Sequence, residues 1–241
     1  MSLEAVLFDV DGTLADTEEA HRQAFNAAFE EFGLPWHWDA PLYRKLLAVT
    51  GGRERIAHYC REVEPARLTQ PGIEEFIARL HARKTKLYED MVRAGQIAVR
   101  PGVVRLLAEL KAAGIRLAIA TTTSRANVEV LLATTLAVLP APIFEVMGCG
   151  EEAAAKKPAP DVYLWVLERL SLPAEACLAI EDSRNGVLAA RSAGIPVLVT
   201  ESAWTQGEDF AGAAAVLPDL GEVDLARLRR IHEEATCRSS S

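Results

Sequence analysis

The chain has 241 residues, half of them hydrophobic and a quarter charged, and 26 Lys and Arg against 34 Asp and Glu residues give a formal net charge of −8. This composition excludes a chain that is disordered throughout, and its acidic balance argues against a general nucleic-acid binder, which is usually basic. No apolar run approaches the roughly 20 residues of a membrane span, and no secretory signal opens the chain. The four cysteines form no C-x-x-C pair. We expect a reduced, cytoplasmic monomer without nucleic-acid or membrane partners.

The first predicted element is a buried parallel strand over residues 3–8, which is followed by Asp9 and Asp11. Side chains two residues apart on a strand point the same way, so both carboxylates should face the strand's carboxyl end, where α/β sheets bind ligands. Two such charges persist there if a cation joins them or one keeps a proton. An ionised aspartate can attack phosphorus, and a protonated one can give its proton to the leaving oxygen. A D-x-D pair alone is more often a surface turn than a catalytic site.

Residues 17–91 differ in character from the rest of the chain. They are charged and mostly helical in pattern, with breaks at residues 33–35, 50–52 and 70–72. Phe25, Phe29 and Phe32 form one apolar stripe on a helix predicted over residues 19–32. We therefore expect a small all-helical domain over residues 17–91, inserted into a core formed by residues 1–16 and 92–241.

From Arg100 onwards, predicted helices and strands alternate. Strands are expected over residues 115–121, 143–147, 176–182 and 195–200, and helices over residues 103–113, 128–132, 160–170 and 185–192. This alternation predicts an α/β fold with a doubly wound, Rossmann-like parallel sheet. The strand over residues 195–200 is expected to close the series. The alanine-rich residues 211–215 receive no structural assignment, and the tail over residues 236–241 is interpreted as a frayed or foreign end.

Three further segments place polar groups near the ends of predicted elements. The hydroxyls and backbone N–H groups of residues 121–123, all threonines, suit a phosphate oxygen, and Glu181 and Asp182 suit Mg²⁺. Lys157 precedes a helix and can neutralise both a nucleophile and a phosphate. Each feature alone has an ordinary alternative: a helix cap, a solvated turn or an exposed lysine. Together with the two aspartates they supply, in order, the parts of a phosphoryl-transfer site.

The segments "DVDGTLADTE", "KKPAPDVY" and "EDSRNG", with Thr121 between the first two, resemble the motifs of the haloacid dehalogenase superfamily of phosphohydrolases. The resemblance implies that Asp9 is the nucleophile, that Asp11 is the general acid and base and that Lys157 balances charge. It also implies that the hydroxyl of Thr121, with Thr122 beside it, holds the transferring phosphoryl group.

The same resemblance implies a Mg²⁺ cofactor. Its ligands would be Asp9, the main-chain carbonyl of Asp11 and Asp182, with Glu181 assisting. The helical insertion would be a cap domain that closes over the site, excludes water and selects the substrate. The candidate substrate-binding residues are Glu18, His21, Tyr43, Thr50, Gly51, Gly52, Arg53, Arg55, Lys84, Thr122 and Thr123.

Within the superfamily, "WHWD" and "TGGRERI" resemble the CbbY-like branch, whose members are similar to phosphatases of xylulose-1,5-bisphosphate. Where relatives often carry lysine after the glycine pair, this chain has Arg53, which keeps the charge but changes the shape of the headgroup. The alternative within the superfamily is a mutase like β-phosphoglucomutase, and a glycolate-phosphate phosphatase is a weaker one. A signalling receiver domain is a distant, non-enzymatic alternative, since receivers need about half this length.

Overall fold

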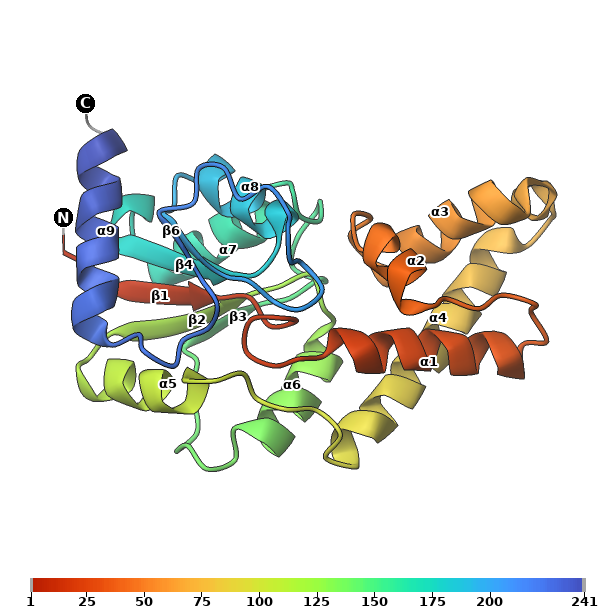
Figure 1. Ribbon diagram of the computed structural model, residues 1–241, viewed down its shortest axis with the longest axis horizontal. Helices are drawn as coiled ribbons and strands as arrows, with labels where there is room; N and C mark the ends of the chain where they lie inside the picture. Colours follow the sequence, from red (N-terminus) through yellow and green to blue (C-terminus); the bar gives the residue numbers. More distant parts are fainter. Residues whose placement is uncertain (1, 240–241) are drawn as a thin grey trace. The chain divides into compact units, whose positions relative to one another are not determined.

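A computed structural model describes residues 2–239, which form two compact units (Figure 1). An α/β unit contains residues up to Asp16 and from Ala98 onwards, and a helical unit contains Thr17–Ile97. The second boundary lies later than residue 91, where the sequence pattern placed it. The difference arises because the last helix of the helical unit, α4 (Ile73–Arg93), continues past Met91, and Ile97 beyond it is still buried.

The α/β unit is built on one six-stranded parallel sheet with the strand order β3-β2-β1-β4-β5-β6. Its strands are β1 (Ala5–Phe8), β2 (Arg116–Ala120), β3 (Val146–Gly148), β4 (Cys177–Glu181), β5 (Val197–Thr200) and β6 (Ala215–Leu217). All residues of β1 and β4 are buried, as expected for a parallel sheet covered on both faces. The order reverses between these two strands, which is where open α/β sheets bind ligands.

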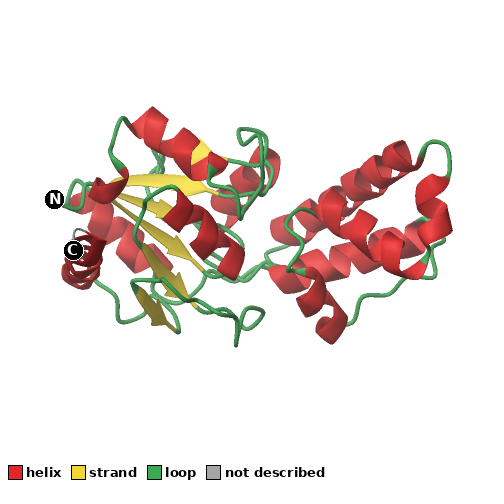
Figure 2. Cartoon of the chain, turned by 90° about the horizontal axis from the view of Figure 1, so that it is seen from above, coloured by secondary structure: helices red, strands yellow, loops and turns green. Residues whose placement is uncertain are grey.

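Helices cover both faces of this sheet (Figure 2). They are α5 (Val103–Ala112), α6 (Arg125–Thr135), α7 (Asp161–Leu170), α8 (Arg184–Ser192) and α9 (Leu225–Ser239), with a short 3₁₀ helix, η2 (Ala174–Ala176). One buried cluster joins the apolar faces of α7 and α8 to β1, β2, β4 and β5. The doubly wound fold predicted from the sequence is therefore confirmed.

The end of the chain differs from the sequence expectation. The strand over residues 195–200 does not close the sheet, because the alanine-rich run leads into β6, and Thr236–Ser239 belong to α9 rather than to a frayed tail. Residues 240 and 241 lie outside the described part. β6 escapes a pattern search because it has only three residues and its Val216 is half exposed. The predicted strand over residues 143–147 also begins too early, since β3 starts at Val146.

The helical unit consists of α1 (Glu18–Glu31), α2 (Ala40–Leu46), α3 (Gly52–Val63), the 3₁₀ helix η1 (Pro65–Thr69) and α4. Its core is aromatic. The Trp38 ring is completely buried and its centroid lies 4.6 Å from that of Phe25 and 4.9 Å from that of Phe29. Aromatic pairs at such distances contribute about 0.5–1.5 kcal/mol each beyond the burial of their surface.

Two short chain passages lie side by side where the sequence leaves and re-enters the α/β unit. Ala15 forms an antiparallel bridge with Val99, the Asp16 N–H donates to the Ala98 carbonyl at 3.0 Å, and the Arg100 N–H donates to the Leu14 carbonyl at 3.0 Å. The turn that begins at Asp11 is therefore tied to the returning chain. Among residues 2–239, the helices lack the long apolar stretch that a bilayer-spanning segment requires.

His232 on α9 is a buried histidine that should make the stability of the protein depend on pH. Its side chain is fully buried, its Nε2 lies 2.7 Å from the Glu175 carbonyl, and its Nδ1 is buried without a partner. Because a carbonyl can only accept, Nε2 carries a proton. Burial lowers the pKa of His232 from its usual 6.5, so the unfolded chain takes up a proton first as the pH falls, and stability is lost below about pH 6.5.

We expect the melting temperature of His232→Gln to fall less than that of the wild type between about pH 7.5 and about pH 5.5, since glutamine can donate to Glu175 but does not titrate. Each kcal/mol of difference corresponds to roughly 2–4 °C in a chain of this size. Thermal unfolding of both proteins at each pH measures the effect. Parallel pH dependence of the two proteins would contradict it.

Candidate active site

A buried lysine joins the ends of two neighbouring strands. Asp9 directly follows β1 and Glu181 ends β4, and the pairing of Phe8 with Ile180 brings these two positions together. The Lys157 Nζ lies 2.6 Å from Asp9 Oδ1 and 2.6 Å from Glu181 Oε1. It also donates to the carbonyl of Ala120, the last residue of β2, at 2.8 Å. One ammonium thus fixes two carboxylates at the carboxyl edge of the sheet.

Asp182 completes a group of three carboxylates with Asp9 and Glu181. One oxygen from each lies within 4.8 Å of the others, and all three side chains are buried. The second oxygen of Glu181, Oε2, is buried without a hydrogen-bond partner in the described part of the chain. Three converging hard oxygens and one orphaned acceptor fit a divalent cation. The predicted closeness of these acids is therefore present in the structure, and the group could bind a metal.

The charge balance of this group points the same way. Burial raises the pKa of Asp9 to about 8, and the neighbouring Glu181 and Asp11 carboxylates add to the rise while Lys157 opposes it. Burial alone would lower the pKa of Lys157, but the carboxylates of Asp9 and Glu181 raise it above its usual value. The lysine therefore stays charged, yet by itself it does not keep Asp9 ionised at neutral pH. A further positive charge beside Asp9 would do so.

Tyr163 belongs to this cluster although the sequence pattern gave it no role. Its phenol on α7 donates a short hydrogen bond to Glu181 Oε1, and the Lys157 Nζ lies 5.2 Å from the centroid of its ring. Burial, with the Glu181 charge, raises the pKa of Tyr163 well above its usual value, so it remains a donor. Tyr163 and Lys157 both occupy Oε1, which leaves Oε2 for another partner. The only sequence signal was its place at the end of "KKPAPDVY".

Gly12 and Gly186 allow the acids to approach the backbone closely. A Cβ added to Gly12 would overlap Asp182 Oδ2, and one added to Gly186 would overlap Glu181 Oε2. Gly12 also has a φ of 79°, in the left-handed region that favours glycine. The turn that the sequence predicted at Gly12 is thus needed both for its backbone angle and for the space that Asp182 occupies.

The predicted acid and base lies beside the threonine cluster. The Thr123 hydroxyl donates a short hydrogen bond to Asp11 Oδ2, and the Thr123 N–H donates to Thr121 Oγ1 at 3.2 Å. Thr121 is buried and Thr122 is half buried. The structure thus brings Asp11 and the threonines together. The carboxylate of Asp11 does not belong to the three-acid group, and the metal contact expected from its main-chain carbonyl stays a prediction.

Three of the predicted substrate residues form one chain of hydrogen bonds inside the helical unit. Arg55 Nη1 donates to Tyr43 Oη at 3.1 Å, and Tyr43 Oη donates to Glu18 Oε2 at 2.8 Å. The remaining Arg55 nitrogens donate to the carbonyls of Leu46 and Val49. The guanidinium of Arg55 is buried and used within the unit, so we reassign this residue from an anion contact to support of the turn before α3.

Arg53 behaves differently although it lies on the same helical turn. Its side chain is exposed, and no described residue hydrogen-bonds or ion-pairs with its guanidinium. Gly51 precedes α3 with a φ of 99°, and Thr50 before it is half exposed. Of the two arginines proposed from the sequence, Arg53 is the one whose donors remain available to a ligand.

His21 and Lys84 form a buried pair between α1 and α4. The Lys84 Nζ lies 2.7 Å from His21 Nδ1, and the His21 ring stacks on Tyr88 with centroids 3.9 Å apart. The ammonium can only donate, so Nδ1 accepts and the ring proton is on Nε2. The aromatic faces of Phe25 and Tyr88 lie 4.7 and 5.3 Å from the Lys84 Nζ. Both predicted residues are therefore held in one defined arrangement.

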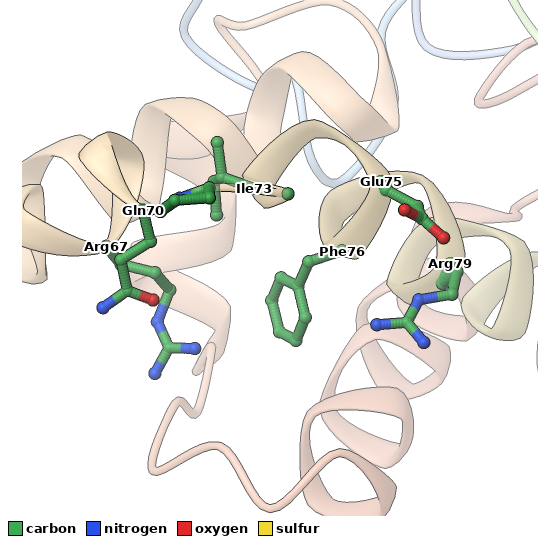
Figure 3. A pocket seen from close by; sticks show the side chains of 8 residues that line it. Arg67, Gln70, Ile73, Glu75, Phe76 and Arg79 are labelled. Carbon is green, nitrogen blue, oxygen red and sulfur yellow. The ribbon is translucent and has the colours of Figure 1, made fainter.

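A hollow of about 290 Å³ lies around the start of α4 (Figure 3). It is lined by Arg67, Gln70, Pro71, Gly72, Ile73, Glu75, Phe76 and Arg79. None of these is a predicted substrate residue, and Arg67 is already paired with Glu64 at 2.8 Å. We assign this hollow no part in catalysis.

The chain is similar to known proteins over most of its length. Residues 3–194 match the model of the haloacid dehalogenase-like hydrolases. The plasmid-encoded CbbY protein of Cupriavidus necator is 54% identical over 220 residues, which cover 91% of this chain and 87% of the relative. The CbbY protein of Rhodobacter capsulatus is 51% identical over 220 residues, which cover 91% and 95%.

Two crystal structures of CbbY from Rhodobacter sphaeroides are also similar. One, in complex with phosphate, has a TM-score of 0.86 and 47% identity over 94% of this chain and 99% of its own. The other is a mutant in complex with xylulose-(1,5)bisphosphate, with a TM-score of 0.85 and 45% identity over the same shares. A β-phosphoglucomutase from Clostridium difficile, at 18% identity and a TM-score of 0.79 over 98% of this chain and 99% of its own, shares the fold.

We expect Gly12→Ala to weaken the binding of a divalent cation at least about tenfold, since the added methyl group would displace Asp182. The matched control is Gly114→Ala, because Gly114 has a similar φ of 76° but nothing within 4 Å of an added Cβ. Both variants should lose roughly 1–2 kcal/mol to backbone strain. Calorimetric titration with Mg²⁺, without substrate, measures the difference. Binding to Gly12→Ala within about twofold of the control would contradict the assignment.

Proposed function

We propose, because this chain belongs to the CbbY family of the haloacid dehalogenase-like hydrolases, that it is a Mg²⁺-dependent phosphatase that removes one phosphate from a sugar bisphosphate. The family membership rests on the matching family model and on relatives at about half identity over nine-tenths of the chain. Xylulose-1,5-bisphosphate is the proposed substrate, since a similar CbbY protein has a crystal structure in complex with it. The product would be a pentulose monophosphate.

One observation carries this proposal. Lys157 contacts the carboxylates of both Asp9 and Glu181 at 2.6 Å while Asp182 completes the acidic group. In this proposal Asp9 would be the nucleophile, Lys157 would neutralise charge and the acids would hold a cation, all at one sheet edge. An anionic phosphoryl group can approach Asp9 only where such positive charge offsets the repulsion between like charges.

The reaction would proceed in two displacements. The Asp9 carboxylate attacks phosphorus, the bond from phosphorus to the sugar oxygen breaks, and Asp11 gives that oxygen a proton. Asp11 then takes a proton from water as the water oxygen attacks the phosphorus of the aspartyl phosphate. The bond to Asp9 breaks and inorganic phosphate leaves. Lys157 and the hydroxyl of Thr121 would hold the phosphoryl oxygens throughout, and the Thr123 hydroxyl would orient Asp11.

Mg²⁺ is the proposed cofactor because the available ligands are oxygens of carboxylates and a main-chain carbonyl. Asp9, Asp182, Glu181 and the Asp11 carbonyl would hold it, and when bound it would screen the negative charge between the phosphoryl group and Asp9. The unpartnered Oε2 of Glu181 supports this ligand set.

Selection of a doubly phosphorylated substrate is proposed for residues of the helical unit. The free guanidinium of Arg53, with the N–H groups at the glycine pair of residues 51–52, would recognise the second phosphate. Glu18 and His21 would recognise sugar hydroxyls, while Tyr43, Arg55 and Lys84 would hold those groups in place through the hydrogen bonds described above.

We expect purified enzyme to release inorganic phosphate from xylulose-1,5-bisphosphate in the presence of Mg²⁺, and we expect Asp9→Asn to lower that rate by at least about a thousandfold, because an amide cannot serve as the nucleophile. A phosphate-release screen over sugar mono- and bisphosphates measures the wild type. Thermal unfolding of Asp9→Asn shows that the variant is folded.

Retention of roughly a tenth of wild-type turnover by Asp9→Asn would contradict its role as nucleophile. The screen also includes β-glucose 1-phosphate, with glucose 6-phosphate measured as a product. Conversion of this sugar phosphate faster than any release of inorganic phosphate would replace the phosphatase by a mutase. Both reactions use an aspartyl phosphate, and they differ in whether water or the sugar accepts the phosphoryl group.

We expect Arg53→Ala to lower kcat/KM for the bisphosphate about 10- to 100-fold, since hydrogen bonds to a charged group are worth about 1.5–3 kcal/mol. Turnover of p-nitrophenyl phosphate, which has no second phosphate, should change less than about twofold. Arg61→Ala, in the last turn of the same helix, is the control. Equal losses on both substrates would remove the second-phosphate role of Arg53.

A further inference from the structure

Arg100 is a buried arginine whose guanidinium is occupied almost entirely by main-chain carbonyls. Its side chain is 7% exposed. The acceptors are Gly12 O at 2.5 Å, Thr200 O at 2.8 Å, Thr200 Oγ1 at 3.1 Å, Glu201 O at 2.8 Å and Pro218 O at 2.9 Å. Its one carboxylate neighbour, Asp16, lies 3.5 Å from Nε and is itself exposed.

Burying the charged guanidinium of Arg100 costs free energy of solvation. A buried charge is normally offset by a buried partner of opposite charge, whereas most hydrogen bonds of Arg100 go to neutral carbonyls. A guanidinium nevertheless offers what an apolar side chain does not, namely several donors in a rigid plane that can hold different loops at once. The structural role of Arg100 can therefore be inferred from the loops that it connects.

Those loops lie at the carboxyl edge of the sheet, on both sides of the acidic group. Gly12 follows β1, Thr200 ends β5 with Glu201 after it, and Pro218 follows β6. β4, which ends at Glu181, lies between β1 and β5 in the sheet. Arg100 thus ties the turn after β1 to the loops beyond β4, so that the turn cannot move away from the strand that carries the acids.

The contact with Gly12 is the one that bears on the cation site. The N–H of Gly12 donates to the Ala15 carbonyl at 2.9 Å, and its carbonyl accepts from Arg100. Both peptide groups that flank Gly12 are therefore fixed in direction. The peptide on its N-terminal side contains the carbonyl of Asp11, and the Cα of Gly12 is so close to Asp182 that a Cβ would overlap its Oδ2.

We propose that Arg100 is a positioning residue of the cation site: it holds the Gly12 turn against Asp182 and so fixes the direction of the Asp11 carbonyl. This rests on the proposed function, which assigns that carbonyl as a ligand. Arg100 acts through Gly12 and touches neither substrate nor cation. Loss of its hold would let the turn drift from Asp182 and separate the ligands before any substrate is bound.

The experiment compares Arg100→Lys with the matched control Arg105→Lys. Arg105 also donates to main-chain carbonyls, those of Leu220, Gly221 and Val223, but away from the acidic group. Lysine keeps the charge of each residue and loses the planar set of donors. Calorimetric titration with Mg²⁺ in the absence of substrate gives the dissociation constant, and thermal unfolding without Mg²⁺ reports stability.

Arg100→Lys is expected to raise the dissociation constant for Mg²⁺ about tenfold or more, the usual effect of losing a residue that orients metal ligands. Its turnover should recover most of the wild-type kcat when Mg²⁺ is saturating. Arg105→Lys should bind Mg²⁺ within about twofold of the wild type, whatever its loss of thermal stability. This split between cation affinity and stability is what a merely structural role would not produce.

A dissociation constant for Arg100→Lys within about twofold of the wild type, or equal weakening by both lysine variants, would overturn the inference. If Arg100→Lys does not fold, Arg100→Gln replaces it, and failure of both to fold would assign Arg100 to stability alone. Absence of Mg²⁺ binding by the wild type would instead remove the proposed function together with this inference. Intact Mg²⁺-dependent phosphate release with unchanged affinity in Arg100→Lys removes the inference alone.

Discussion

The buried contact of one ammonium with two carboxylates organises the α/β unit around its sheet edge. Lys157 lies 2.6 Å from both Asp9 and Glu181, and Asp182 adds a third acid. When all three acids are ionised, one positive charge faces three negative ones, and burial denies them the solvation that would relieve the imbalance. Burial is the main cause of the rise in the pKa of Asp9 to about 8, and the neighbouring carboxylates of Glu181 and Asp11 add to it. A divalent cation bound at this group would supply the positive charge that the lysine alone does not.

The fold determines where this cluster forms. β1 and β4 are neighbours in the sheet although the whole helical unit and two further strands separate them in the sequence. Their parallel register places Asp9 beside Glu181, and glycines remove the side chains that would keep the acids away from the backbone. Around them, Tyr163 donates a hydrogen bond to Glu181 and Arg100 donates one to the carbonyl of Gly12. The site is thus supported from several loops rather than by its ligands alone.

The acids and the lysine could be predicted from the sequence because the carboxyl ends of parallel strands share one edge of the sheet. Residues at or after these strand ends, namely Asp9, Glu181, Asp182 and Lys157, are therefore expected to lie close together. Sequence reasoning did not reach Tyr163 or Arg100, since a tyrosine on an amphipathic helix and an arginine before a Pro-Gly turn have the same local pattern whether they face solvent or buried hydrogen-bond acceptors. β6 was missed for a related reason: three half-exposed residues give too little periodicity to distinguish a strand from a loop.

The two arginines of "TGGRERI" show why charge alone is a poor guide to a ligand site. Successive helical residues are about 100° apart around the axis, so positions 53 and 55 differ by roughly 200° and face nearly opposite sides of α3. Arg55 therefore points into the helical unit and uses its donors on Tyr43 and the end of α2, while Arg53 remains free. The Arg55 guanidinium is buried, and each of its three nitrogens already donates a hydrogen bond inside the helical unit. The exposed Arg53 is therefore the better candidate for a second-phosphate contact, while Arg55 holds the carbonyls of Leu46 and Val49 before α3.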